Sequence, residues 1–91
     1  MAKNVKLLGK MRRSQAGYTP KDIERLLKSC GFKKIEGGSH TLYRHPDFPE
    51  LAATIPRHPE VGTIYVKQAV ELVDKLQVLE QQRAANNNEN N

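Results

Sequence analysis

The sequence predicts a small α+β domain, in which a three-stranded antiparallel sheet carries two helices on one of its faces. Three observations support this prediction. An apolar stripe with helical spacing follows Thr19, three short segments with strand-like alternation lie between glycine and proline turns, and a second helical stripe follows Thr63. Short connections between the strands favour a meander, and each helix must bury its apolar side against the sheet. The other face of the sheet is expected to be relatively open.

The chain has 91 residues, which allows one domain with a modest core. Its net charge of +5 is unevenly distributed. Residues 1–17 contain five basic side chains and no acidic one, whereas ten basic and ten acidic side chains balance in the remainder. The basic character that suggests a polyanionic partner therefore belongs mainly to the N-terminal segment.

The single cysteine, Cys30, permits no disulfide within the chain, and no CxxC or Cys/His pattern indicates a zinc site. A zinc site made of histidines is not expected either, because His40 and His45 should point to opposite faces of a strand. No apolar run is long enough for a signal peptide or a membrane-spanning helix. We therefore expect a cytoplasmic protein with no metal, no small-molecule cofactor and no membrane partner.

Residues 1–18 are expected to form a flexible basic arm. A short apolar cluster within it could form one or two amphipathic turns on a partner, but no cap is evident and Gly17 follows at once. The first helix of the domain should start at Thr19, which can cap it, with Pro20 at the first helical position and Asp22 in the first turn. Its apolar face comprises Ile23, Leu26, Leu27 and Cys30, and Gly31 suits a left-handed residue at its end.

The three predicted strands follow in quick succession. The first covers residues 32–36, Gly37-Gly38 forms a turn, and the second covers residues 39–45. In the second strand His40, Leu42 and Arg44 share one face, and Thr41, Tyr43 and His45 share the other; the pattern leaves open which face is core. The third strand covers residues 51–55 and should end at Pro56, since proline cannot donate to a ladder.

Thr63 can cap the second helix of the domain, whose apolar stripe runs from Tyr65 to Leu79. From Glu80 the composition changes to Gln, Asn and Ala. We expect residues 80–91 to be a disordered tail, because they lack the apolar surface that a folded segment buries. The predicted organisation is thus an arm (1–18), a domain (19–79) and a tail (80–91).

Several short motifs occur in an order that resembles one known family. These are Gly38-Ser39-His40, Tyr43 before Arg44-His45-Pro46, Ile55-Pro56 with His58, and Gly62-Thr63 leading into Lys67-Gln68-Ala69. Together they resemble the HicA family of small bacterial toxins, whose fold is related to double-stranded-RNA-binding domains. The resemblance implies an α-β-β-β-α sandwich, an mRNA interferase activity with His40 as the catalytic histidine, and a HicB-type antitoxin as partner.

The chemistry of RNA cleavage without a metal gives His40 a specific role. The reaction needs a base for the 2′-OH, an acid for the leaving oxygen, and positive charge near the phosphate. Histidine can transfer either proton, whereas the second proton partner is unidentified; His58 is one candidate. The RNA-binding candidates are Lys33, Lys34, Gly38, Ser39, Arg44, Arg57 and Lys67.

Two other functions remain open from the sequence. The chain could be a double-stranded-RNA-binding module of the same fold without chemistry, although the balanced charge after residue 17 argues against that. It could also be a protein-interaction module that offers its open sheet face or its strand edges to a partner. The bland interpretations are that His40 is a hydrogen-bonded structural residue and that His45 and His58 are turn or surface residues.

Overall fold

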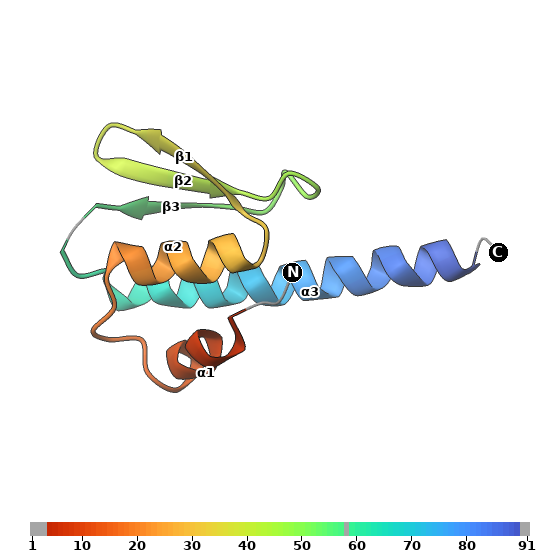
Figure 1. Cartoon of the computed structure of the whole chain (residues 1–91), viewed down its shortest axis with the longest axis horizontal. Coiled ribbons are helices and arrows are strands. Elements are labelled where there is room, and N and C mark those ends of the chain that lie inside the picture. The colour runs from red at the N-terminus through yellow and green to blue at the C-terminus, as the bar shows by residue number, and fades with distance from the viewer. Residues whose placement is uncertain (1–3, 58, 90–91) are drawn as a thin grey trace.

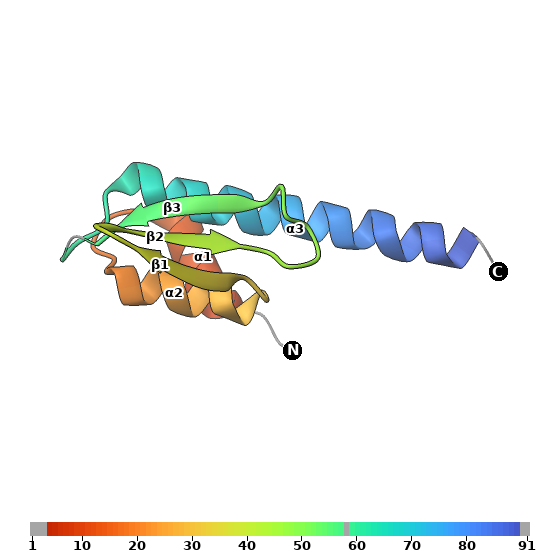
Figure 2. The same ribbon diagram turned by 90° about the horizontal axis from the view of Figure 1, so that it is seen from above.

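The computed structural model describes residues 4–57 and 59–89. They form α1 (Val5–Arg13), α2 (Pro20–Ser29), β1 (Lys33–Gly37), β2 (His40–Arg44), β3 (Ala52–Pro56) and α3 (Thr63–Glu89). The strands form an antiparallel sheet in the order β1-β2-β3. Helices α2 and α3 cover one face of the sheet, and α1 lies against the far side of these two helices (Figure 1). Seen from above, the other face of the sheet has no helix over it (Figure 2). The predicted α-β-β-β-α order is confirmed, with one more helix in front of it.

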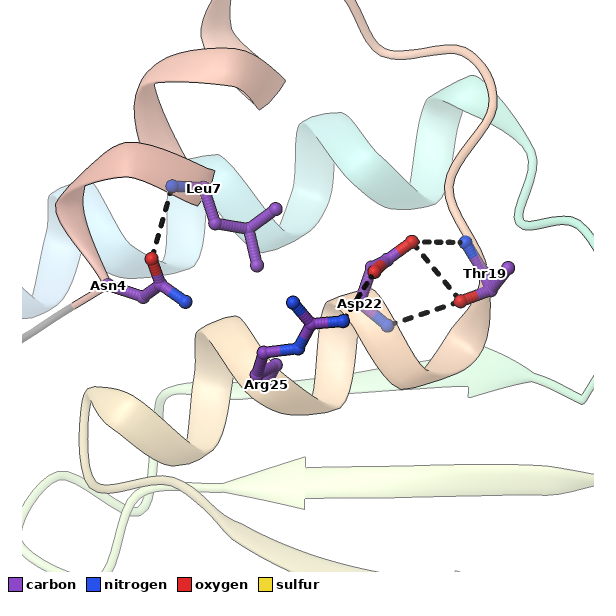
Figure 3. A network of polar contacts seen from close by, with 5 residues as sticks. All are labelled: Asn4, Leu7, Thr19, Asp22 and Arg25. Atoms are coloured by element: carbon purple, nitrogen blue, oxygen red, sulfur yellow. Dashed lines mark hydrogen bonds and ion pairs between the residues drawn. The ribbon is translucent and has the colours of Figure 1, made fainter.

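Helix α2 begins where its capping residues predict. The side chain of Thr19 accepts a hydrogen bond from the backbone N–H of Asp22, and the Asp22 carboxylate accepts one from the backbone N–H of Thr19 (Figure 3). This capping box satisfies two backbone donors at the helix start. The helix ends at Ser29, and Gly31 follows with φ +93°, the left-handed conformation in which glycine is favoured.

The main core lies between the sheet and the layer of α2 and α3. Its fully enclosed side chains come from both helices and from β3: Ile23, Leu26, Leu27, Ile55, Val66, Val73 and Leu76. Helical spacing places the helix residues of this set on the sides of α2 and α3 that face each other and the sheet. The apolar stripes that the sequence shows are therefore the surfaces that hold the sheet and the helices together.

The prediction of a flexible arm is wrong for residues 5–13, which form α1. The Asn4 side chain caps this helix by accepting from the backbone N–H of Leu7 at 3.2 Å (Figure 3). The apolar cluster of the segment, Leu7, Leu8 and Met11, is buried against the helical layer. Arg12 also binds the Asp74 carboxylate of α3 with both terminal nitrogens, one of them at 3.1 Å. The cluster thus finds its partner within the chain, because α2 and α3 leave apolar surface on the side away from the sheet.

The predicted disorder from residue 80 onward is also wrong as far as Glu89, because α3 continues to that residue and projects beyond the rest of the molecule (Figure 1). Helix nucleation is the unfavourable step, and the packed first half of α3 has already provided it. Residues with good helix propensity, such as Gln, Arg and Ala, can then extend the helix. Arg83 lies over the Phe48 ring, 5.5 Å from its centroid, and 3.9 Å from the Asp47 carboxylate. Despite the length of α3, the described part of the chain contains no helix apolar enough to cross a bilayer.

Candidate functional site

The structure decides which face of β2 is core. Thr41 and Tyr43 are buried beneath the sheet, at 6% and 3% exposure, whereas His40 and Arg44 are exposed and Leu42 is half-buried. Side chains alternate along a strand, so the face that carries His40 is the one no helix covers. His40 is therefore available to a large ligand.

His40 lies at the start of β2, directly after the turn that joins β1 to β2. Gly38 and Ser39 form the two-residue turn of this hairpin. Gly38 has φ +47°, and the turns that are favoured in two-residue hairpins need a positive φ at this first position. The Ser39 hydroxyl lies 3.1 Å from His40 Nδ1 and orients the ring. Within residues 4–57 and 59–89 no partner engages Nε2, so this nitrogen is the one that can meet a substrate.

Two of the predicted RNA-binding cations share the open face with His40. Lys33 of β1 lies opposite Arg44 of β2, and both are exposed. Arg44 is four residues from His40, which corresponds to about 13 Å along a strand. Between the histidine and the two cations lie Ile35, 48% exposed, and the half-buried Leu42. The open face is thus a strip with a histidine at one end, apolar side chains in the middle and positive charge at the other end.

Lys34 and Arg57, which the sequence groups with these cations, lie on the covered side of the sheet instead. Lys34 Nζ is 2.6 Å from the Glu24 carboxylate and 3.1 Å from that of Glu36. Arg57 Nε donates to Thr41 Oγ1 at 3.3 Å, and its Nη2 lies 4.0 Å from Glu36. Both cations therefore bind acidic or hydroxyl groups of the chain itself.

These ion pairs change the proton affinities of the groups involved. The hydrogen bond from Lys34 holds the pKa of the Glu24 carboxyl below its ordinary value. Glu24, and then Glu36, raise the pKa of Lys34. Burial raises the pKa of the Tyr43 hydroxyl, and the nearby Glu24 charge adds to that effect. At neutral pH the Tyr43 hydroxyl is accordingly protonated and can donate a hydrogen bond.

Lys67 lies apart from the strip on the open face. It precedes Asp74 by seven residues on α3, a spacing that places both on one stripe of the helix. Asp74 is bound by Arg12 of α1, and α1 lies on the side of α3 away from the sheet (Figure 1). The sequence-based grouping of Lys67 with the phosphate contacts of His40 is therefore not reproduced by the fold.

His45 does not join His40 on the open face. His45 stands in the turn after β2, as expected, but at 5% exposure it is a buried residue and not a surface residue. Its ring packs edge-on against Phe32 at 5.1 Å, and its Nδ1 accepts from the backbone N–H of Asp47 at 3.1 Å. His58 lies outside the described residues.

The acidic partners beneath the sheet are the residues that the sequence analysis missed. Glu36 follows Lys34 by two residues, so strand alternation alone places both on one face. That signal was present in the sequence. Glu24 gave no such signal, because its contact with Lys34 depends on how α2 lies across the sheet.

A family model described as "HicA toxin of bacterial toxin-antitoxin" matches residues 20–74, which is more than half of the chain. The matched region begins with α2 and ends within α3, so it includes the whole sheet and His40 but not α1. Neither a curated protein nor a solved structure matches the chain. The chain therefore belongs to the HicA family of toxins from bacterial toxin–antitoxin systems.

Proposed function

We propose that this chain is an endoribonuclease that cleaves mRNA, with His40 as a general acid or base, and that a HicB-type antitoxin neutralises it. The observation that carries the proposal is the position of His40. Its ring stands exposed on the uncovered sheet face, and Ser39 lies 3.1 Å from Nδ1. Family membership supports a toxin, and a solvent-exposed, oriented histidine supports proton transfer as its chemistry.

The reaction is an attack within one RNA strand. The 2′-oxygen loses its proton and forms a bond to the adjacent phosphorus, and the bond from phosphorus to the leaving 5′-oxygen breaks as that oxygen gains a proton. The products are a 2′,3′-cyclic phosphate and a free 5′-hydroxyl. His40 Nε2 transfers one of the two protons, and the backbone N–H of Gly38 and the hydroxyl of Ser39 are nearby donors for phosphate oxygens.

The remainder of the open face suits the RNA chain that continues from the cleaved phosphate. Lys33 and Arg44 carry no ion pair with any of the described residues, so their charges are available to phosphates. The apolar Ile35 and Leu42 lie between them and His40. An antitoxin that packs on these apolar side chains would also cover His40, which gives one surface for the substrate and for the inhibitor.

Expression of the native chain and of His40→Ala in bacteria tests the nuclease. We expect the native chain to stop growth and degrade mRNA, and His40→Ala to lower cleavage by at least about 100-fold, the usual contribution of a positioned acid or base. Co-expression of a HicB-type antitoxin should restore growth. Purified native chain should leave 2′,3′-cyclic phosphate ends on a labelled RNA.

The thermal unfolding of the two proteins serves as the control. Because His40 is exposed, His40→Ala should unfold at the same temperature as the native chain, so that a loss of activity is a loss of chemistry. Equal toxicity of both proteins with intact RNA would contradict the nuclease. If the native chain binds RNA but never cleaves it, the alternative of a non-catalytic RNA-binding module is supported instead.

A further inference from the structure

Beneath the β1–β2 hairpin, the structure contains a pocket of about 310 Å³ that the proposed chemistry at His40 does not use. Its walls come from the first turns of α2, from β1 and β2, and from the residue after β3. The side chains that matter here are Pro20, Glu24, Lys34, Glu36, Tyr43 and Arg57. A volume of this size is at the lower end of the range for small-ligand sites.

Tyr43 points a polar group into this pocket. Its side chain is 97% buried, yet no residue that the structure describes forms a hydrogen bond with its hydroxyl. Among the described residues no fully enclosed side-chain polar atom lacks a partner, so the hydroxyl must open into the pocket that Tyr43 lines. Solvent therefore reaches this hydroxyl, and a ligand that enters the pocket can accept a hydrogen bond from it.

The pocket presents acceptors and donors close together. Lys34 lies between the carboxylates of Glu24 and Glu36, at 2.6 and 3.1 Å, and Arg57 approaches Glu36 from the end of β3 at 4.0 Å. Lys21 also lines the pocket, but Glu24 and Glu36 offset the charges of Lys34 and Arg57, so the lining offers a phosphate little net positive charge. A neutral planar group that both donates and accepts hydrogen bonds, such as a nucleobase, suits this set of side chains.

The pocket lies directly across the sheet from His40. Thr41 follows His40 in β2 and points to the covered side, where its hydroxyl accepts from Arg57. His40 also stands at the end of the sheet, beside the hairpin turn. An RNA strand that passes His40 on the open face can therefore bend around this end and insert the neighbouring base beneath the hairpin.

We propose that this pocket binds one base of the RNA, next to the phosphate at His40, and selects a base that carries an exocyclic amino group. This inference rests on the proposed ribonuclease function. Glutamate accepts a hydrogen bond from the amino group of a base such as cytosine, whereas uracil has none to offer. The Tyr43 hydroxyl, Lys34 and Arg57 donate to the ring nitrogens and carbonyl oxygens of the base. The pocket would thus be a specificity site that disfavours uracil.

Binding of labelled oligocytidylate, oligoadenylate and oligouridylate to the full-length His40→Ala chain tests the pocket, with fluorescence anisotropy as the readout. The substitution prevents cleavage during the measurement. We expect oligocytidylate to bind about tenfold more tightly than oligouridylate, because one additional hydrogen bond to a carboxylate is worth about this much. Tyr43→Phe and Glu36→Gln, added separately, should each bring this ratio close to one.

Tyr65→Phe is the matched control, because it removes a hydroxyl from a half-buried tyrosine on α3 outside the pocket, and it should leave the ratio unchanged. The inference would be overturned if the His40→Ala chain bound oligocytidylate and oligouridylate equally. It would also be overturned if the ratio of the two affinities stayed the same in both Tyr43→Phe and Glu36→Gln. If the native chain cleaves RNA without any base preference, the proposal for the pocket is wrong and the proposed nuclease stands. If the native chain binds the oligonucleotides with a base preference but cleaves none of them, the proposed nuclease is wrong and the proposal for the pocket stands.

Discussion

The two faces of the sheet differ although the same three strands form both. The covered face is packed on α2 and α3, and its charged side chains, such as Lys34 and Arg57, bind partners of the same chain. The open face exposes His40, Lys33 and Arg44, which have no acidic partner among the described residues. The proposed proton transfer and phosphate contacts thus belong to the open face, whereas the packing that stabilises the fold belongs to the covered face. Removing a side chain from the open face should therefore change the free energy of unfolding much less than removing one from the covered face.

The largest expected effect separates two adjacent residues of β2. Tyr43→Ala should lower the free energy of unfolding by about 3 to 5 kcal/mol, because it empties a buried aromatic site. Leu42→Ala, at a half-buried position on the open face, should cost about 1 kcal/mol. Urea unfolding of both variants measures the difference, and equal losses would mean that the open face is covered in solution.

The covered side also depends on one glycine. Gly31 has φ +93°, and a Cβ placed on it would lie 3.1 Å from Nε2 of the buried His45. Gly31→Ala should therefore lower the free energy of unfolding by about 1 to 3 kcal/mol. Gly9→Ala is the matched control: a Cβ at this helical position meets nothing within 4 Å, and alanine should stabilise α1 by about 0.5 to 1 kcal/mol. A stabilising effect of Gly31→Ala would refute this packing.

A smaller effect should appear in the salt dependence of RNA binding. Lys33→Gln and Arg44→Gln should each weaken binding to single-stranded RNA and reduce the slope of log affinity against log salt by about 0.7. Lys67→Gln, on the side of α3 that faces away from the sheet, should leave the slope unchanged. The slopes follow from titrations at several salt concentrations. If Lys67→Gln reduced the salt slope as much as Arg44→Gln does, the RNA would bind across the helices and not on the open face.

The smallest effect concerns the ion pair beneath the sheet. Because the pKa of Glu24 is lowered by folding, its contribution to stability is complete above pH 4.5 and is lost as the pH falls through the lowered value. For Lys34 the pKa is raised, so its contribution is complete below pH 10.5 and is lost as the pH rises through the raised value. Both side chains are about a third exposed, which keeps the effect modest.

Melting temperatures across the pH range, measured for the native chain and for Glu24→Gln, test this pair. The difference between the two proteins should be constant near neutral pH and shrink below pH 4.5. A difference that grows in acid would show that Glu24 destabilises the fold.

Most elements of the fold could be predicted from local sequence. The three predicted strands lie within a residue of β1, β2 and β3, because glycine and proline turns bound them. Pro56 is the exception: it is the last residue of β3 and not the stop before it. The backbone N–H of Arg57 donates to the Ser39 carbonyl, so the ladder bonds flank the His40–Pro56 pair and the missing proline N–H is not needed there.

The candidate site was predicted in part for the same reason. Alternation places His40 and Arg44 on one face, and the structure keeps them there. Lys34 and Arg57 were grouped with them by charge, but charge says nothing about direction, and both point to the covered side. The predictions for the two terminal segments are wrong because composition does not show long-range contacts. It does not show that α2 and α3 expose apolar surface on which α1 packs. Nor does it show that the packed first half of α3 allows the helix to continue into the polar segment.

The sequence by itself determined the elements of this protein, since caps, turn residues and apolar spacing act over a few neighbouring residues. It also predicted that His40 follows a hairpin turn, and its motifs indicated that the chain resembles the HicA family. Only the tertiary structure decided which face of β2 is core, where Lys34, Arg57 and Lys67 point, and that residues 5–13 belong to the packed body. A strand with a period of two offers two equivalent faces, and the long-range packing of the helices chooses between them.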